Sequence, residues 1–294
     1  MDINRTVLVT GANGFTGRFV CKNLKKKNIP FIALIRPKGD ISWMENQSID
    51  YRFADLNNTE QLSRAMKDCT YLLNIASIGF GSAPSIIKAC EKAGISRAVF
   101  ISTTSIYTKL NSVSKGIRLS AENSIKKSNL KWTILRPTMI YGTGGDRNMI
   151  KLIRWIDKIK VLPVFGDGRS LQQPIFVEDL AWSIVEVLHK ESTYRQSFNL
   201  SGEYPISFKE VINNIETCLN KKVIRLYLPA KLTIYFLRFI ERIKILLPIK
   251  AEQIERLNED KDFKHTKASK YFNFSPMSFK KGINLEVRKY LEKK

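Results

Sequence analysis

Cysteine and histidine are both scarce in this chain, and the way they are spread excludes several kinds of site. The 294 residues include four cysteines, Cys21, Cys69, Cys90 and Cys218. They form no CxxC pair, so we expect free thiols in a reducing compartment, with neither a zinc site nor a disulfide framework. The two histidines, His189 and His265, stand in no motif typical of a metal site or a catalytic triad. The sequence therefore predicts a protein without a bound metal.

Long apolar segments and acidic residues are also few. No run reaches the roughly 18 apolar residues of a membrane span, and no secretory signal is visible, so we expect a cytoplasmic protein. The 27 acidic residues are outnumbered by 49 basic ones, which gives a net charge of +22. Such a charge indicates an anionic partner: phosphate groups, nucleic acid or an anionic membrane. Because no nucleic-acid-binding motif is present, we expect no nucleic-acid partner.

The first 136 residues alternate short apolar runs with helical patterns. The predicted strands are residues 6–10, 31–35, 51–53, 71–75, 98–102 and 132–136. The predicted helices are residues 14–27, 58–66, 82–93 and 112–128. This alternation predicts an α/β fold, a Rossmann-type doubly wound parallel sheet over residues 1–136. Residues 137–294 mix shorter elements and predict a smaller C-terminal cap, from which residues 172–202 return to the core.

A glycine-rich turn follows the first predicted strand and opens the first predicted helix. Gly11 permits a tight turn, Gly14 leaves room for a pyrophosphate, and Gly17 allows the helix to pack closely. The helix N-terminus offers unpaired N–H groups to phosphates. We therefore predict a dinucleotide site that includes Asn13 and Phe15 of the same turn. The alternative is a tight strand–helix turn without a ligand.

Dinucleotide choice is read at the end of the second predicted strand, where NAD sites place a carboxylate. Arg36 stands there, followed by Lys38, and cations suit a 2′-phosphate. We therefore predict NADP(H). NAD(H) is the alternative, with Arg36 in solvent and Asp40 reaching back. Asp55 and the neighbouring Leu56 follow the third predicted strand and are placed to meet the adenine.

Six segments carry a family resemblance. They are TGANGFTG at 10–17, ADL at 54–56, FISTTSIY at 100–107, LRPTMIYG at 135–142, FGDG at 165–168 and QQPIFVEDLA at 172–181. In their order and spacing the chain resembles the extended and atypical branch of the short-chain dehydrogenase/reductase superfamily, the NAD-dependent epimerase/dehydratase-like proteins. The resemblance covers residues 1 to about 200. It also implies that Ala76 and Pro137 border the cofactor.

The resemblance implies a catalytic Ser or Thr, followed by a Tyr-x-x-x-Lys pair on the next helix. Thr103 matches the hydroxyl that polarises the substrate oxygen, and Lys115 matches the lysine that holds the nicotinamide ribose. Asn111 stands where the tyrosine is expected. Three explanations stay open: Tyr107 supplies the phenol, Lys115 alone is the acid/base, or the protein binds cofactor without chemistry.

The resemblance also places a sugar pocket at the cap. The implied lining residues are Ser77, Thr138, Met139, Tyr141, Asn148 and Gln172. Many relatives have arginine where this chain has Gln172 or Gln173, and Arg147 or Arg169 could substitute for it. Arg118 and Glu122 follow Lys115 at helical spacings, which predicts either a surface ion pair or an arginine that reaches a substrate phosphate.

Residues 221–250 are unusual because they hold eight Lys or Arg residues and one acid. A helix over 230–247 is predicted between Pro229 and Pro248. Its predicted apolar face consists of Leu232, Phe236, Phe239, Ile240, Ile243 and Leu247, with Lys231, Arg238 and Arg242 opposite. The helix either packs on the cap or makes a peripheral contact with an anionic membrane, which would suggest a lipid-linked sugar.

Together these observations predict an NAD(P)(H)-dependent oxidoreductase or epimerase that acts on a nucleotide- or lipid-linked sugar. The sugar class comes from the resemblance, and so does a homodimer formed through paired helices that include residues 112–128. The rival is a catalytically reduced NAD(P)-binding structural or regulatory protein, similar to complex I accessory subunits or redox sensors. Asn111 favours the rival, whereas Thr103 and Lys115 favour the enzyme.

Overall fold

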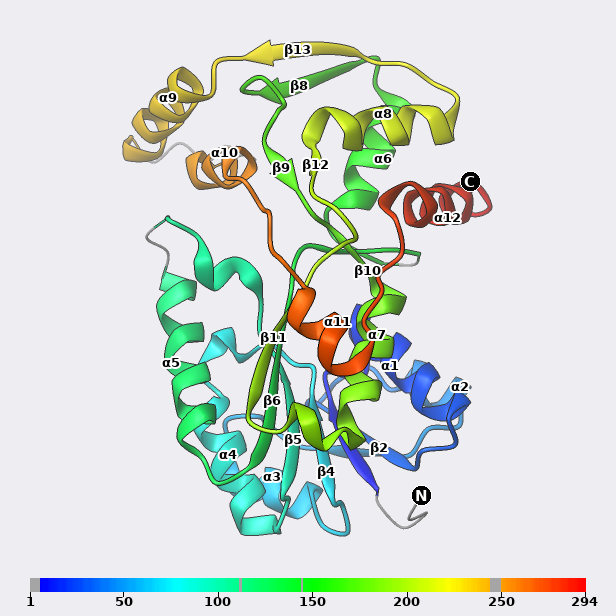
Figure 1. Cartoon of the computed structure of the whole chain (residues 1–294), viewed down its shortest axis with the longest axis vertical. Helices are drawn as coiled ribbons and strands as arrows, with labels where there is room; N and C mark the ends of the chain where they lie inside the picture. Colours follow the sequence, from blue (N-terminus) through cyan, green and yellow to red (C-terminus); the bar gives the residue numbers. More distant parts are fainter. Residues whose placement is uncertain (1–5, 111–112, 144, 244–249) are drawn as a thin grey trace.

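The computed structural model describes residues 6–110, 113–143, 145–243 and 250–294. Its main body is a parallel seven-stranded sheet in the order β11-β6-β5-β4-β1-β2-β3 (Figure 1). The strands are β1 (Val7–Thr10), β2 (Phe31–Ile35), β3 (Tyr51–Phe53), β4 (Tyr71–Asn74), β5 (Arg97–Ile101), β6 (Lys131–Pro137) and β11 (Gln196–Leu200). The predicted Rossmann-type sheet is therefore confirmed, with strand ends within about two residues of those predicted.

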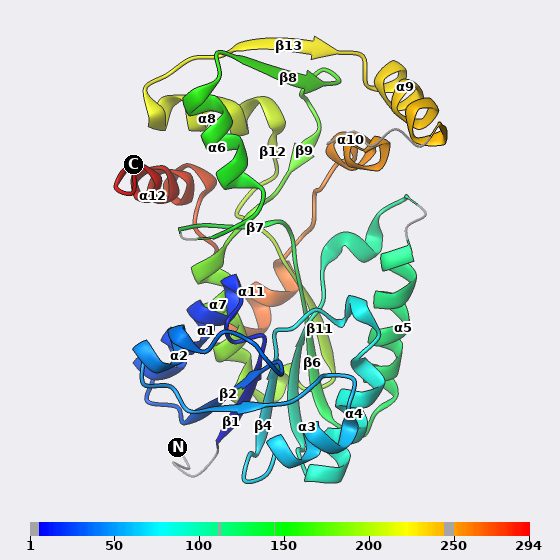
Figure 2. The same ribbon diagram turned by 180° about the vertical axis from the view of Figure 1, so that it is seen from behind.

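The sheet is buried on both faces, as its continuous apolar strands require. In β1 the side chains of Val7 and Val9 join one hydrophobic cluster and Leu8 joins the other, because successive side chains point to opposite faces. The first cluster lies under α1 (Phe15–Lys26), α2 (Ser42–Asn46), α7 (Val177–Glu186) and α11 (Thr266–Phe272). The second lies under α3 (Thr59–Ala65), α4 (Ala83–Ala93) and α5 (Val113–Lys127), as Figure 2 shows from behind.

The cap is built from short two-stranded sheets and helices around a third cluster. The sheets pair β7 (Ile140–Tyr141) with β10 (Ile175–Phe176), β9 (Leu171–Gln172) with β12 (Ile206–Ser207), and β8 (Val161–Phe165) with β13 (Ile224–Leu228). The helices are α6 (Met149–Lys158), α8 (Phe208–Leu219), α9 (Ala230–Arg242), α10 (Ala251–Asn258) and α12 (Phe279–Leu291). Within the described ranges no helix is long and apolar enough to cross a bilayer.

The chain returns from the cap to the core twice. The range 172–202 contains α7, which packs on α1, and β11, which pairs with β6. A second return, absent from the sequence prediction, brings α11 onto β11. In the described part of the chain four 3-10 helices complete the fold: η1 (Ile78–Phe80), η2 (Thr104–Tyr107), η3 (Val187–His189) and η4 (Glu191–Thr193).

One buried arginine ties the returning segment to the sheet. The guanidinium of Arg97, in β5, is 1% exposed. It donates to the carbonyl oxygens of Lys131 at 2.6 Å, Val187 at 2.6 Å and Leu188 at 3.1 Å. A buried guanidinium loses its hydration, and these hydrogen bonds to the main chain compensate for that loss. Arg97 thus joins β5, β6 and η3 at the amino ends of the two strands.

Candidate active site

The glycine-rich turn between β1 and α1 has the shape that its glycines require. Gly11 has φ +66°, and a Cβ atom there would lie 2.7 Å from the backbone nitrogen of Ala76. A Cβ atom on Gly17 would lie 2.1 Å from the carbonyl oxygen of Gly11. Both glycines are therefore needed for the turn itself, whatever binds there. The Ala76 nitrogen also donates to Thr10 Oγ1 at 3.2 Å, which holds the ends of β1 and β4 together.

The N-terminus of α1 fits a dinucleotide pyrophosphate. Gly14 is exposed, and the sole described atom near its missing Cβ is the Gly11 oxygen at 3.2 Å. No described side chain caps the helix, so the first-turn N–H groups beginning at Phe15 are available to a ligand. An anion there is stabilised by these donors and by the helix dipole. The residues present therefore fit a nicotinamide dinucleotide.

The adenosine side of this site is rich in cations. Arg36 and Lys38 are exposed after β2. Arg18, which the sequence analysis missed, donates to Asn13 Oδ1 at 2.7 Å, and Asn13 Nδ2 in turn donates to the Asp40 carbonyl at 2.7 Å. The Asp40 carboxylate accepts two hydrogen bonds from Ser42, which lower its pKa. Asp40 is therefore occupied locally in this structure instead of reaching toward the dinucleotide.

The remaining predicted adenine contacts lie after β3. Asp55 is exposed, and its Oδ1 accepts from the Asn57 nitrogen at 2.9 Å. Leu56 packs partly buried against the cluster beneath α3 and α4. The cap of α3 is Asn58, whose Oδ1 accepts from the Gln61 nitrogen at 3.0 Å. Asp55 therefore shapes the turn and leaves helix capping to Asn58.

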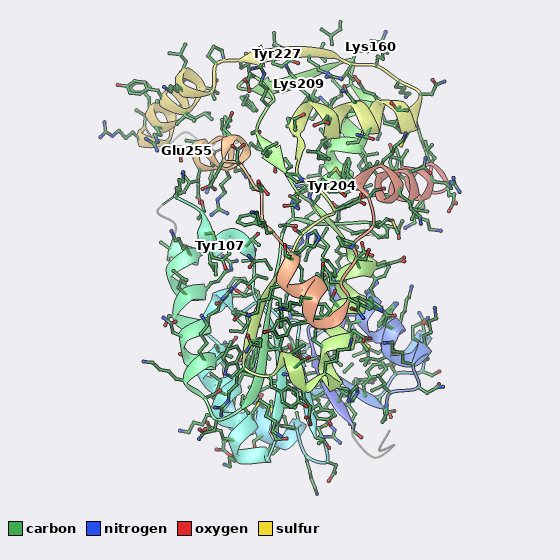
Figure 3. All side chains as sticks on the ribbon, viewed as in Figure 1. Tyr107, Lys160, Tyr204, Lys209, Tyr227 and Glu255 are labelled. Atoms are coloured by element: carbon green, nitrogen blue, oxygen red, sulfur yellow. The ribbon has the colours of Figure 1, made fainter. Side chains whose placement is uncertain are left out.

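A cavity of about 860 Å³ opens at the carboxyl ends of β4, β5 and β6, beneath α10. Six of the predicted site residues line it: Ser77, Thr103, Tyr107, Thr138, Met139 and Asn148. This is where parallel α/β sheets bind their ligands. In Figure 3 Tyr107 lies in this region, below α10 and its labelled residue Glu255. The structure thus gathers residues from β4 through α6 at one cavity.

Thr103 is presented to the cavity with a donor to spare. Its Oγ1 accepts from the Ser105 nitrogen at 3.2 Å and caps η2. Within the described chain its hydroxyl proton has no acceptor. Its neighbour Thr104 is instead directed inward, where it donates to the Pro137 carbonyl at 3.4 Å. Thr103 can therefore donate to a substrate oxygen without losing an existing bond.

Lys115 does not line the cavity directly. Its Nζ donates to the Thr108 carbonyl at 2.6 Å, so the amine holds the loop that follows η2. Glu259 holds the same loop, because its carboxylate accepts from Thr108 Oγ1 at 2.7 Å and from the Lys109 nitrogen at 2.6 Å. Asn111, at the family's tyrosine position, lies outside the described residues.

Tyr107 stands at the cavity with its phenol held from both sides. The oxygen accepts from Arg136 Nη1 at 2.9 Å and donates to Asn199 Oδ1 at 3.3 Å. Arg136 is fixed by Glu122, through bonds of 2.8 and 2.5 Å. Burial alone would raise the pKa of Glu122, but hydrogen bonds from Arg136 hold it below its usual value. Of the two alternatives left open for Arg118, the surface ion pair with Glu122 is therefore wrong.

Arg118 is one of four cations around the cavity. It lies against Gly79, and its pKa is lowered by burial and by the nearby charge of Arg256. Arg256 and Lys261 line the opposite wall, and Lys109 completes the set. The pKa of Lys261 is also lowered by burial. The acids Glu259 and Asp260 line the same cavity, and Arg256 donates to the Glu252 carboxylate at 2.6 Å. Two guanidinium groups at one cavity suit a diphosphate, for which Arg256 would exchange that bond.

The cations from the C-terminal segment were missed by the sequence analysis. The signal was the charged run Glu255–Lys261, which follows the basic helix and precedes the return to the core. The two substitutes considered for the family arginine lie elsewhere. Arg147 lines a separate groove between α6 and α12, and Arg169 is exposed beside Asp167. Arg118 and Arg256 are the guanidinium groups at the cavity.

Two predicted lining residues are buried away from the cavity. Tyr141 is 1% exposed, and its ring packs against Phe176 and Phe279 in the core of the cap. Burial raises its pKa far above the usual range. Gln172 is 6% exposed, and its Nε2 donates to the Leu257 carbonyl at 3.4 Å. Neither side chain is brought to the other predicted substrate residues.

Among the described residues, no group of acidic, histidine or cysteine side chains could hold a metal.

Residues 11–160 match the model of a family described as NAD(P)H-binding. A relative from Escherichia coli O157:H7, named N-acetyl-alpha-D-glucosaminyl-diphospho-ditrans,octacis-undecaprenol 4-epimerase, is 23% identical over 78% of this chain and 77% of its own. Among solved structures, UDP-glucose 4-epimerase from Thermotoga maritima with UDP-glucose has a TM-score of 0.77 at 16% identity, covering 98% and 99% of the two chains. MoeE5 in complex with UDP-glucose and NAD has a TM-score of 0.76 at 18% identity, covering 98% and 99%.

The chain belongs to the NAD(P)H-binding family and, with it, to the extended, epimerase/dehydratase-like branch of the short-chain dehydrogenase/reductase superfamily. The predicted family is thus confirmed, and so is a nicotinamide cofactor as a class. The solved structures share the fold over nearly their whole length.

Proposed function

We propose that the protein is an NAD(P)(H)-dependent epimerase or oxidoreductase that acts on an activated sugar. The observation that carries this proposal is the cavity beside the dinucleotide site, which combines Thr103 and Tyr107 with the guanidinium groups of Arg118 and Arg256. A hydroxyl donor next to two guanidinium groups suits a sugar that carries a diphosphate. The Escherichia coli relative is named for a sugar on undecaprenol diphosphate, and the Thermotoga structure holds UDP-glucose, so the carrier is a nucleotide or a lipid.

In this proposal a nicotinamide dinucleotide held at the turn of Gly11, Gly14 and Gly17 would supply hydride transfer to and from the sugar. Thr103 donates a hydrogen bond to the reacting sugar oxygen, and Arg118 and Arg256 hold the diphosphate. The proton leaves the sugar hydroxyl for one of two bases. Tyr107 is at the cavity, whereas Lys115 must first exchange its bond to the Thr108 carbonyl. Both candidates remain in the proposal, because Asn111 offers no equivalent phenol.

The test is the absorbance of the reduced nicotinamide on the protein. NADPH- or NADP-loaded protein is mixed with UDP-glucose, other nucleotide sugars, their 4-keto forms and a lipid-linked diphosphate sugar. We expect a change in bound cofactor with at least one of them. Tyr107→Phe and Lys115→Ala, compared at saturating cofactor, then identify the group that accepts the sugar proton, because its loss removes turnover. Lys127→Ala is the matched control for Lys115→Ala, because Lys127 is exposed at the other end of α5. Tight cofactor binding without change across the panel contradicts the enzyme and favours the binding-only rival.

For the cofactor we propose NADP(H) over NAD(H). The exposed cations Arg36 and Lys38 and the locally bonded Asp40 carboxylate support this preference. Arg36→Glu should reverse the order of the dissociation constants for NADPH and NADH. Equal wild-type affinities for NADPH and NADH would contradict the proposal.

Dimerisation through α5 stays a prediction, which light scattering of the wild-type protein can test.

A further inference from the structure

One face of α9 is apolar and uncovered. Five side chains on it are more than half exposed: Leu232 at 71%, Tyr235 at 79%, Phe236 at 58%, Phe239 at 58% and Ile243 at 51%. Their spacing of three, four, seven and eleven residues places them along one side of the helix. Single exposed apolar side chains are usual on protein surfaces, but a contiguous exposed apolar patch is not. Such a patch therefore marks a binding surface.

The uncovered face is not left over from a poorly packed helix. The opposite face is docked on α10, where Ile234 and Leu237 of α9 pack with Ala251 and Ile254. Glu241 Oε1 accepts from the Ala251 nitrogen at 2.9 Å. An ion pair of Arg238 with Glu255 adds to the same contact. Four residues of the predicted apolar face, Leu232, Phe236, Phe239 and Ile243, are therefore exposed, and a narrower stripe does the packing. Leu247 of that predicted face lies outside the described residues.

The charges of α9 indicate what covers this face. Lys231, Arg238 and Arg242 lie along one edge of it and not opposite it as predicted, since they follow each other at seven and four residues. Arg238 is paired with Glu255, so Lys231 and Arg242 are the cations that can meet a ligand. Glu241 is bonded to α10, as described, so no acid is left on the exposed side of α9. Aromatic and aliphatic side chains bordered by cations match the interface of an anionic bilayer. In both ribbon views α9 projects at the outer end of the cap, where a flat surface can reach it (Figures 1 and 2).

We infer that α9 docks the protein onto an anionic lipid bilayer, with Leu232, Phe236 and Phe239 inserted among the lipids. The contact would lie beside the candidate active site, because α10 packs on α9 and its end supplies Arg256 and Asn258 to the cavity. If the proposed function holds, on which this last step rests, the geometry favours a lipid-linked diphosphate sugar over a soluble nucleotide sugar. The structure shows the predicted helix over Ala230–Arg242, and residues 244–247 of the predicted range lie outside the described residues.

The test is co-sedimentation of the full chain with vesicles of phosphatidylcholine alone or mixed with phosphatidylglycerol. We expect binding to the anionic vesicles and, for Leu232→Ser with Phe236→Ser and Phe239→Ser, a loss of about tenfold or more in partitioning. Tyr204→Ser is the matched control, since this aromatic side chain is 70% exposed on the β11–β12 connection away from α9. It should bind like the wild type.

A second variant tests the charge without touching the apolar face. Lys231→Glu with Arg242→Glu should weaken binding to anionic vesicles by about tenfold or more and have little effect on zwitterionic ones. Circular dichroism melting checks that each variant is folded, and if the serine variant is not, the charge variant decides. The inference is overturned if the wild type stays in solution with anionic vesicles. It is also overturned if the serine substitutions convert a dimer to a monomer and leave vesicle binding unchanged, since a second copy would then cover the face. Neither readout needs turnover, so failure here is separate from failure of the proposed function.

Discussion

The buried ion pair of Glu122 and Arg136 offers a sharp stability test. The side chain of Glu122 is 1% exposed and that of Arg136 is 11% exposed, and two hydrogen bonds join them. Glu122→Ala leaves the guanidinium buried without its carboxylate. Removing one partner of a buried pair costs about 3–5 kcal/mol. At about tenfold per 1.4 kcal/mol, the folding equilibrium constant should fall by roughly two orders of magnitude or more.

Urea unfolding followed by circular dichroism measures this cost. Glu60→Ala is the matched control. Glu60 is likewise in an ion pair, with Lys92, but both of these side chains are more than half exposed. We expect no measurable change for it. The pKa of Glu122 is below its usual value in the folded state, so the pair stabilises above the unfolded pKa of about 4.3 and its contribution fades as pH falls below that. A cost for Glu122→Ala as small as that for Glu60→Ala would refute the reasoning.

Three further changes have defined outcomes. Gly17→Ala should abolish NADPH binding in a fluorescence titration, because its Cβ would meet the Gly11 oxygen at 2.1 Å, whereas Gly116→Ala, with open space around it, should bind normally. Arg97→Met removes the hydrogen bonds that the guanidinium donates to the Lys131, Val187 and Leu188 carbonyls, of which Val187 keeps a donor in Thr193 Oγ1, and should lower the free energy of unfolding in urea by about 3 kcal/mol or more; a loss under about 1 kcal/mol contradicts this. Burial and the charge of Asp146 raise the pKa of Glu286 to about 10, so the wild type should lose stability as pH rises from about 4.3 toward 10. Glu286→Gln should remove that decline, and parallel urea profiles at pH 5 and 8 for both proteins would contradict it.

The sheet was predictable because its strands are short apolar runs between helical patterns. Val7–Thr10 and Arg97–Ile101 are buried throughout, which is the local signature of a parallel sheet covered on both faces. The glycine turn was predictable for the same reason: the spacing of Gly11, Gly14 and Gly17 is a local constraint on backbone geometry. Such features depend on neighbours within about twenty residues along the chain.

The cap and much of the candidate site depend on distant contacts. The pairing of β8 with β13 joins Val161 to Ile224, and no local pattern specifies that partner. The direction of Lys115 depends on a loop that Glu259 holds from 150 residues away. The partner of Glu122 was mistaken because helical spacing favoured Arg118, while the fold brings Arg136 of the neighbouring strand to the buried side of α5. Burial on one face of a helix decides between such partners, and spacing alone does not.

The position of β11 at the sheet edge has a consequence for how the chain folds. β11 is the last strand of the sheet in sequence, yet it hydrogen-bonds along β6 from Thr133 to Pro137. Until residue 200 has left the ribosome, β6 is an open edge whose backbone groups can pair with another chain. A fragment that ends at residue 160, where the family match ends, would keep that edge open. We expect such a fragment to aggregate, and the folding nucleus to include contacts separated by more than sixty residues.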